Sequence, residues 1–220
     1  MDQDSDVLKM ACECYGFGRW AAPYWFIGPE QGQSPDEHND LKPRAKAWLC
    51  LGGGELNDCR KFHELIGEKR LHRETPQLQR TWRPLMLLLM AFLGEPTKND
   101  GLRDYQRDKW GALDGDTCVV ELSGMAAHSF KIDRDRNCFL EKRVKIIRER
   151  ILQHKPKFVV MYGMREKLSW ERIADRPFPR ENILELGPTI LALTPHPTSH
   201  GSTNEYWKGL GNRLRLMSSK

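Results

Sequence analysis

Short apolar runs that each end at glycine or proline alternate with helical stretches along this chain of 220 residues. Apolar or β-branched runs bounded by turn residues are typical of buried β-strands. Strands that alternate with helices favour an α/β fold in which helices cover both faces of a mostly parallel sheet. The predicted strands are 24–27, 117–122, 157–162, 183–186 and 189–194. We therefore expect a single domain, a three-layer α/β/α sandwich with a central, mostly parallel four-stranded sheet.

Apolar residues at helical spacing predict the helices that cover this sheet. Their expected ranges are 4–15, 42–51, 58–66, 77–93, 101–110, 137–154, 165–174 and 204–217. Residues 85–93 are apolar on all sides, which predicts a core helix, and Pro84 is expected to kink or split it. The basic side chains of the stretch 137–154 are interpreted as a solvated face. They are Lys142, Arg143, Lys145, Arg148 and Arg150.

Charge and hydropathy restrict the classes of partner. The chain carries 35 basic and 30 acidic residues, a net charge of +5, which is a mild indication of a polyanionic partner. Acidic residues follow Met1, so no signal peptide is predicted, and the longest apolar run is too short to cross a bilayer. We expect a cytoplasmic monomer that does not bind membranes.

The six cysteines do not form a recognisable metal motif. They are Cys12, Cys14, Cys50, Cys59, Cys118 and Cys138, and none forms a Cys-x-x-Cys pair. In the cytoplasm they would be reduced, and we interpret them as buried free thiols. His196 and His200 are spaced like a metal pair but have no evident third ligand. We predict no metal and no cofactor.

Two of the predicted strands end in loops that carry a titratable side chain. The first strand passes into Gly28-Pro29-Glu30-Gln31-Gly32, and the last passes into Pro195-His196-Pro197, where two prolines fix the backbone around the imidazole. In open parallel sheets, ligands bind outside the carboxyl ends of the strands. We therefore expect Glu30 and His196 to face one cleft.

These two loops resemble the motif pair of the uracil-DNA glycosylase superfamily, G-x-[D/E/N]-x-[G/Y] after an early strand and H-P-[S/T] after a late one. The resemblance spans roughly residues 20–217. It implies that the Gly28–Gly32 loop activates water and that the His196–Ser199 loop is the His-Pro-Ser loop. Two features depart from the family. Cys12 and Cys14 replace the Cys-x-x-Cys pair of the branches with an iron–sulfur cluster, and Glu121 followed by Ser123 stands where uracil-specific members have asparagine.

The chemistry of N-glycosidic hydrolysis gives these residues roles. The sugar becomes positive and the departing base negative, so Glu30 and His196 are the catalytic candidates, Glu30 below the sugar and His196 as a donor to the base. A base must also be flipped out of the duplex and stacked on an aromatic ring. Trp25, Trp48, Phe62 and Tyr162 are available for stacking. The candidates for base contact are Glu121, Ser123, Gly28, Gln31 and Trp48, and those for DNA contact are Thr198, Ser199, His200, Ser202, Lys208 and Arg165.

A carboxylate at Glu121 would accept a hydrogen bond from an exocyclic amine such as N4 of cytosine. This favours a glycosylase that acts on double-stranded DNA containing a phage-type modified cytosine, hydroxymethylated or glucosylated, in antiviral defence. The alternatives are a repair glycosylase for uracil or hypoxanthine and a non-catalytic DNA-binding module. Another α/β hydrolase or nucleotide-binding enzyme is disfavoured, because no P-loop follows any predicted strand. Glu30 and His196 also have purely structural interpretations, as a carboxylate bound by backbone amides and a buried core histidine.

Overall fold

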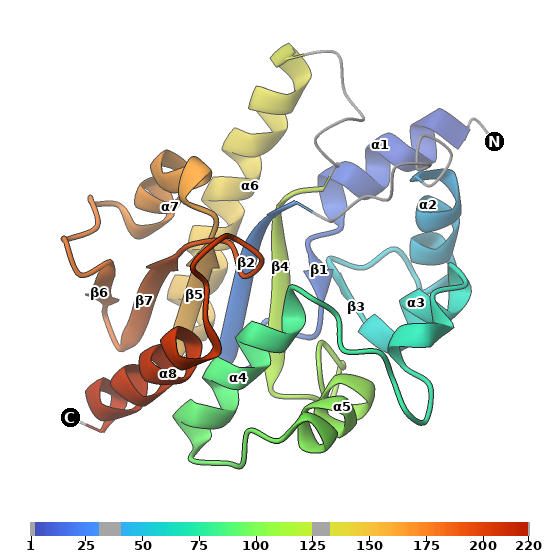
Figure 1. Ribbon diagram of the computed structural model, residues 1–220. Helices are drawn as coiled ribbons and strands as arrows, with labels where there is room; N and C mark the ends of the chain where they lie inside the picture. The colour runs from blue at the N-terminus through green and yellow to red at the C-terminus, as the bar shows by residue number, and fades with distance from the viewer. Residues whose placement is uncertain (1–2, 31–40, 125–132, 220) are drawn as a thin grey trace.

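The computed structural model describes residues 3–30, 41–124 and 133–219, and it confirms the α/β fold (Figure 1). The described residues form one seven-stranded sheet in the order β3-β1-β4-β2-β5-β7-β6. Its centre is the predicted parallel sheet of four strands, each hydrogen-bonded to the next. These strands are β4 (Thr117–Ser123), β2 (Tyr24–Glu30), β5 (Phe158–Tyr162) and β7 (Thr189–Thr194).

Three short strands extend the sheet beyond this four-stranded centre, and one of them, at 183–186, was predicted with the same bounds. β6 (Ile183–Leu186) lies antiparallel to β7 at one edge. At the other edge, β1 (Gly16–Phe17) pairs antiparallel with β4 and parallel with β3 (Leu56–Asn57). β1 and β3 contain two residues each, too few to form an apolar run, so only their pairing partners define them as strands.

Helices cover both faces of the sheet and complete the three layers. α6 and α7 pack on one face, and the remaining helices lie on or around the other, where α4 packs along α8 (Figure 1). The bounds are α1 Gln3–Glu13, α2 Leu41–Cys50, α3 Cys59–Leu65, α4 Trp82–Leu93, α5 Asn99–Asp108, α6 Asp133–His154, α7 Lys167–Ala174 and α8 Asn204–Ser218, with 3-10 turns η2 Lys69–Leu71 and η3 Met164–Glu166. Among the described helices, none is both long enough and apolar enough to cross a membrane.

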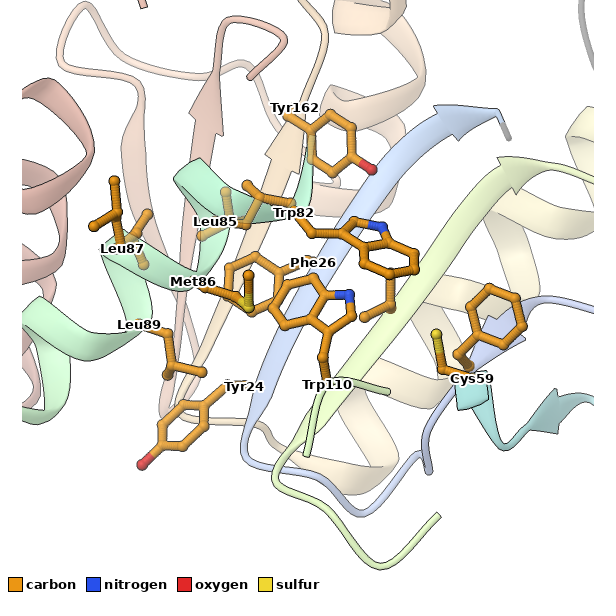
Figure 2. Close-up of a cluster of buried hydrophobic side chains, with 14 of the residues drawn as sticks. Tyr24, Phe26, Cys59, Trp82, Leu85, Met86, Leu87, Leu89, Trp110 and Tyr162 are labelled. Carbon is orange, nitrogen blue, oxygen red and sulfur yellow. The ribbon is translucent and has the colours of Figure 1, made fainter. Parts of the chain in front are cut away.

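β2 lies at the centre of the sheet and is buried on both faces. Trp25 and Ile27 pack toward α6 and α7, while Tyr24 and Phe26 pack toward α4. Figure 2 shows the second group, in which Phe26 and Trp110 lie beneath residues of α4. A strand buried on both faces shows an apolar run rather than an alternation, which explains why this strand was recognisable from the sequence.

α4 is shorter than predicted and is not kinked at Pro84. The helix begins at Trp82, because the side chain of Gln79 accepts hydrogen bonds from the backbone amides of Thr81 and Trp82 at 2.6 and 2.7 Å. Pro84 is therefore in the first turn, where a missing amide hydrogen costs nothing. The side chain of Gln106, on α5, accepts from the Gln79 amide at 2.9 Å and fixes this start.

The interpretation of the basic side chains of α6 as a solvated face is wrong for Arg143. Its side chain is buried, with 1% of its surface exposed, and it stacks on the ring of Tyr15 at 4.1 Å. The guanidinium donates at 2.8 to 3.0 Å to four backbone carbonyls. They are those of Ala11 within α1, Cys14 directly after α1, and Glu121 and Leu122 in β4. Arg143 therefore ties the N-terminal segment and the carboxyl end of β4 to α6.

Candidate functional site

The carboxyl ends of the four parallel strands bring most of the candidate residues to one edge of the sheet. Gly28 on β2 is in register with Glu121 on β4, and Glu30 is in register with Ser123. On the other side of β2, Tyr162 ends β5 and is in register with Thr194, two residues before His196. The ends of β2 and β7 therefore lie at the same edge of the sheet with β5 between them, and that Glu30 and His196 face one cleft stays a prediction.

Gly28 leaves room for the side chain of Tyr162. A Cβ atom at residue 28 would overlap the Tyr162 hydroxyl and lie 2.5 Å from Cζ of its ring. Tyr162 points from the end of β5 toward β2 in Figure 2, and 3% of its surface is exposed. A glycine is thus required at residue 28, because the side chain of Tyr162 on the neighbouring strand occupies the space that a Cβ atom would need.

Glu121 lies beside the same tyrosine. Burial, and then the negative charge of Glu121, raise the pKa of Tyr162 well above its usual range, so its phenol stays protonated at neutral pH. The backbone of Glu121 is held by Arg143, which donates to its carbonyl at 2.8 Å. The edge therefore carries the side chain of Glu121 and a protonated phenol on the two strands that flank β2.

His196 is held in one tautomer by its own loop. The backbone amide of Thr198 donates to Nδ1 at 3.3 Å, and the Thr198 hydroxyl lies 2.9 Å from the same atom. An amide can only donate, so Nδ1 accepts and the proton of the neutral imidazole is on Nε2. Burial lowers the pKa of His196, and the ring packs edge-on against Tyr162 with centroids 5.5 Å apart. At neutral pH this histidine is an uncharged Nε2–H donor.

Two candidates of the first loop lie partly or wholly outside the described residues. The backbone of Glu30 is the last residue of β2, but its side chain lies outside the described residues. Gln31 lies outside them altogether.

The candidates for DNA contact follow β5 and β7. Thr198 and His200 are exposed in the loop between β7 and α8, and Arg165 is exposed in η3, directly after β5. The Ser202 hydroxyl accepts from the indole of Trp207 at 2.6 Å, so it stabilises the start of α8. Lys208 is partly exposed in the second turn of α8, and the hydroxyl oxygen of Ser199 is buried without a hydrogen-bond partner in the described part of the chain.

Trp48 is not part of this edge. It is fully buried on α2, and its indole donates to the Gly54 carbonyl at 2.9 Å. Trp25 and Phe62 are also core residues, with 0% and 2% of their surfaces exposed. Tyr162 is the one of the four stacking candidates that lies at the strand ends. Tyr162 ends an apolar run before Gly163, and this position at a strand end is the sequence signal that distinguishes it from the other three.

No metal site forms around the histidines of the last loop within the described residues. His196 and His200 belong to no group of three potential ligands, whereas Cys59, His63 and His72 form such a group on the far side of β1. Two surface pockets, one beside β6 and one beside α3, contain none of the residues at the strand ends.

Comparison of the chain with models of known protein families finds no match. A search of curated protein sequences finds no match either. The assignment of a function therefore depends on the geometry and chemistry of the strand ends.

Proposed function

We propose that this chain is a DNA glycosylase of the uracil-DNA glycosylase superfamily that flips a base from double-stranded DNA and hydrolyses its N-glycosidic bond. Water adds to the anomeric carbon of the sugar, the bond to the base breaks, and the base leaves as an anion that takes up a proton. Within this proposal the protein works as a cytoplasmic monomer.

One observation carries the proposal. The end of the strand that delivers Glu30 lies beside β4 and β5, and the loop of His196 follows β7 at the same edge with its imidazole as an Nε2–H donor. A glycosidic bond between the two groups would have a carboxylate to stabilise the positive sugar and a donor to stabilise the negative base. Removal of either group from such a site typically lowers the rate by about 10²- to 10³-fold.

The half-buried side chain of Glu121 at the end of β4 supports a cytosine-type base as the substrate. A carboxylate accepts from an exocyclic amine, and uracil offers a carbonyl oxygen at that place, which would face Glu121 unfavourably. A hydroxymethyl or glucosyl-hydroxymethyl cytosine, as found in modified phage DNA, is therefore the proposed target, and antiviral defence the proposed role.

Single-turnover cleavage tests the proposal. Labelled duplexes would each carry one uracil, hypoxanthine, hydroxymethylcytosine or glucosylated hydroxymethylcytosine, and abasic sites would be revealed with alkali. We expect the wild type to cleave a modified cytosine, with a loss of about 10²- to 10³-fold in Glu30→Gln and in His196→Ala. Glu121→Gln is expected to shift the base preference, because an amide can also donate to a carbonyl.

Matched variants separate the site from general effects. Glu185→Gln on the β6 edge and His154→Ala at the end of α6 change the same residue types away from the strand ends, and they should retain activity. Cleavage of uracil or hypoxanthine alone would favour a repair glycosylase. Tight binding without abasic sites on any duplex would refute the enzymatic proposal in favour of a DNA-binding module.

A further inference from the structure

A second cluster of chemically capable side chains lies away from the strand ends. Cys59 begins α3, His63 lies one turn later on the same helix, and the chain returns through η2 to place His72 beside them. All three are buried, with 0%, 8% and 3% of their surfaces exposed. One potential ligand atom from each falls within 4.8 Å of the other two.

The distances in this cluster fit a tetrahedral metal centre. Sγ of Cys59 lies 3.5 Å from Nδ1 of His63 and 3.9 Å from Nε2 of His72. A zinc ion with bonds of about 2.3 Å to sulfur and about 2.0 Å to nitrogen separates these ligand atoms by about 3.6 Å. We propose that Cys59, His63 and His72 bind a divalent transition-metal ion of the zinc class, independently of the function proposed above.

The ligand types select this class of ion. One thiolate and two imidazoles suit zinc and its neighbours, whereas magnesium and calcium require oxygen ligands. The two imidazoles would bind such an ion as neutral rings, through Nδ1 of His63 and Nε2 of His72. The Cys59 thiol must lose its proton to the solvent as the metal–sulfur bond forms, so that binding releases one proton per ion.

Binding also replaces an existing hydrogen bond. Nδ1 of His63 lies 2.6 Å from the Cys59 carbonyl oxygen, so this nitrogen carries the ring proton before the ion arrives. Coordination at Nδ1 moves that proton to Nε2 and ends the hydrogen bond to the Cys59 carbonyl. The change of tautomer gives a second readout of binding, one that does not depend on absorption by the metal.

The cluster has an access path and a structural consequence. His72 lines a surface pocket together with Arg60, Glu64 and Cys50, and this pocket gives an ion and a coordinating water a route to the cluster. The rings of His63 and His72 pack against Trp82, with centroids 5.4 and 6.2 Å away. A bound ion would therefore link α3, the segment after η2 and the first residue of α4.

Cobalt titration tests the site. Reduced protein freed of metal with a chelator would be titrated with Co²⁺, which gives a thiolate charge-transfer band when cysteine binds it. We expect one equivalent to bind, Zn²⁺ to displace it, and Zn²⁺ to raise the melting temperature. His72→Gln and Cys59→Ser should weaken binding more than about 100-fold, beyond the loss expected for a residue that only supports a ligand. The ring nitrogens of His63 would be followed by NMR.

Control variants make the result specific. Cys118→Ser removes a fully buried thiol that belongs to no group of three potential ligands in the described part of the chain, and Cys50→Ser removes the exposed thiol of the pocket, so both should bind Co²⁺ like the wild type. Circular dichroism would confirm that each variant is folded. Absence of the charge-transfer band in the folded wild type, or its persistence in Cys59→Ser, would overturn the proposal and leave a thiol–imidazole hydrogen bond as the reason for the cluster.

Discussion

The ring of Tyr162 occupies the space in which residue 28 would carry a side chain. A Cβ atom at Gly28 would lie 2.5 Å from Cζ and 2.8 Å from Cε2 of that ring, closer than packed atoms approach each other. The two residues are on neighbouring parallel strands at the edge that holds the candidate site. Any change at one of them must therefore be accommodated by the other.

Gly28→Ala is expected to lower the free energy of unfolding by about 1–3 kcal/mol, because the new methyl group overpacks against Tyr162. The cost should shrink in a Tyr162→Ala background, where the methyl group has room. Urea denaturation of the four members of this double-mutant cycle gives the coupling energy. A coupling energy of zero would mean that the strand adjusts without displacing the ring.

Gly211 and Gly209 form a matched pair on α8. A Cβ at Gly211 would overlap the Leu88 carbonyl of α4 and lie 3.0 Å from Cβ of Ala91, whereas nothing lies within 4 Å of a Cβ at Gly209. Gly211→Ala should therefore destabilise the fold by about 1–3 kcal/mol. Gly209→Ala should stabilise it by up to about 1 kcal/mol, because alanine restricts the unfolded chain and favours the helix. Thermal unfolding of both variants checks the opposite signs.

Arg143→Met is expected to cost at least about 3 kcal/mol, because four backbone carbonyls lose a charged donor while methionine keeps most of the packing volume. The neighbouring Lys142→Met, exposed on the same helix, should change the stability by less than about 0.5 kcal/mol. Hydrogen exchange at the end of β4 would also increase in Arg143→Met. Equal stability losses in the two variants would contradict the role of Arg143 as a clamp.

The ring of His196 should take up a proton only below the ordinary histidine pKa of about 6.5, because burial lowers its pKa. The lowered pKa of His196 also makes the free energy of unfolding depend on pH. The unfolded chain takes up the proton at higher pH than the folded chain, so this contribution to the free energy of unfolding decreases as the pH falls below about 6.5. A titration of the His196 ring by NMR, with His196→Gln as the reference for stability, measures both.

Thr198→Val tests the hydrogen bonding of the imidazole. The substitution removes the hydroxyl that lies 2.9 Å from Nδ1 and keeps the backbone amide that donates to the same atom. We expect the Nε2–H tautomer to persist, with activity reduced by less than in His196→Ala. A switch of the ring to the Nδ1–H tautomer in nitrogen-detected spectra would show that the hydroxyl, not the amide, selects it.

The central strands could be predicted because each is an apolar run closed by glycine or proline. The bounds of β7 agree with the sequence prediction at both ends, and those of β4 and β5 differ by one residue. β1 and β3 could not be predicted, since two residues carry no period. The start of α4 could not be predicted either, because it depends on Gln79 and Gln106, which are 27 residues apart.

The part of the candidate site that lies at the carboxyl ends of strands could be predicted from the sequence. Gly28, Glu121 and His196 come together for that reason, while Trp48 was chosen for its residue type and is a core residue. Arg143 lies on the buried stripe of α6, one turn before Ile147, but its charge led to the opposite interpretation. Cys59 and His63 are four residues apart on one helix, and only the return of the chain through η2 reveals His72 as their neighbour.

The strands that end at the site come from two separate portions of the chain. β2 and β4 precede residue 125, β5 and β7 follow residue 157, and β2 joins the two pairs through β5. α6 of the second portion holds β4 of the first, and α4 of the first packs along α8 of the second. During translation the loop of His196 emerges only after the other three strands have been made. A nascent chain released before that point therefore lacks one of the two candidate groups of the strand ends.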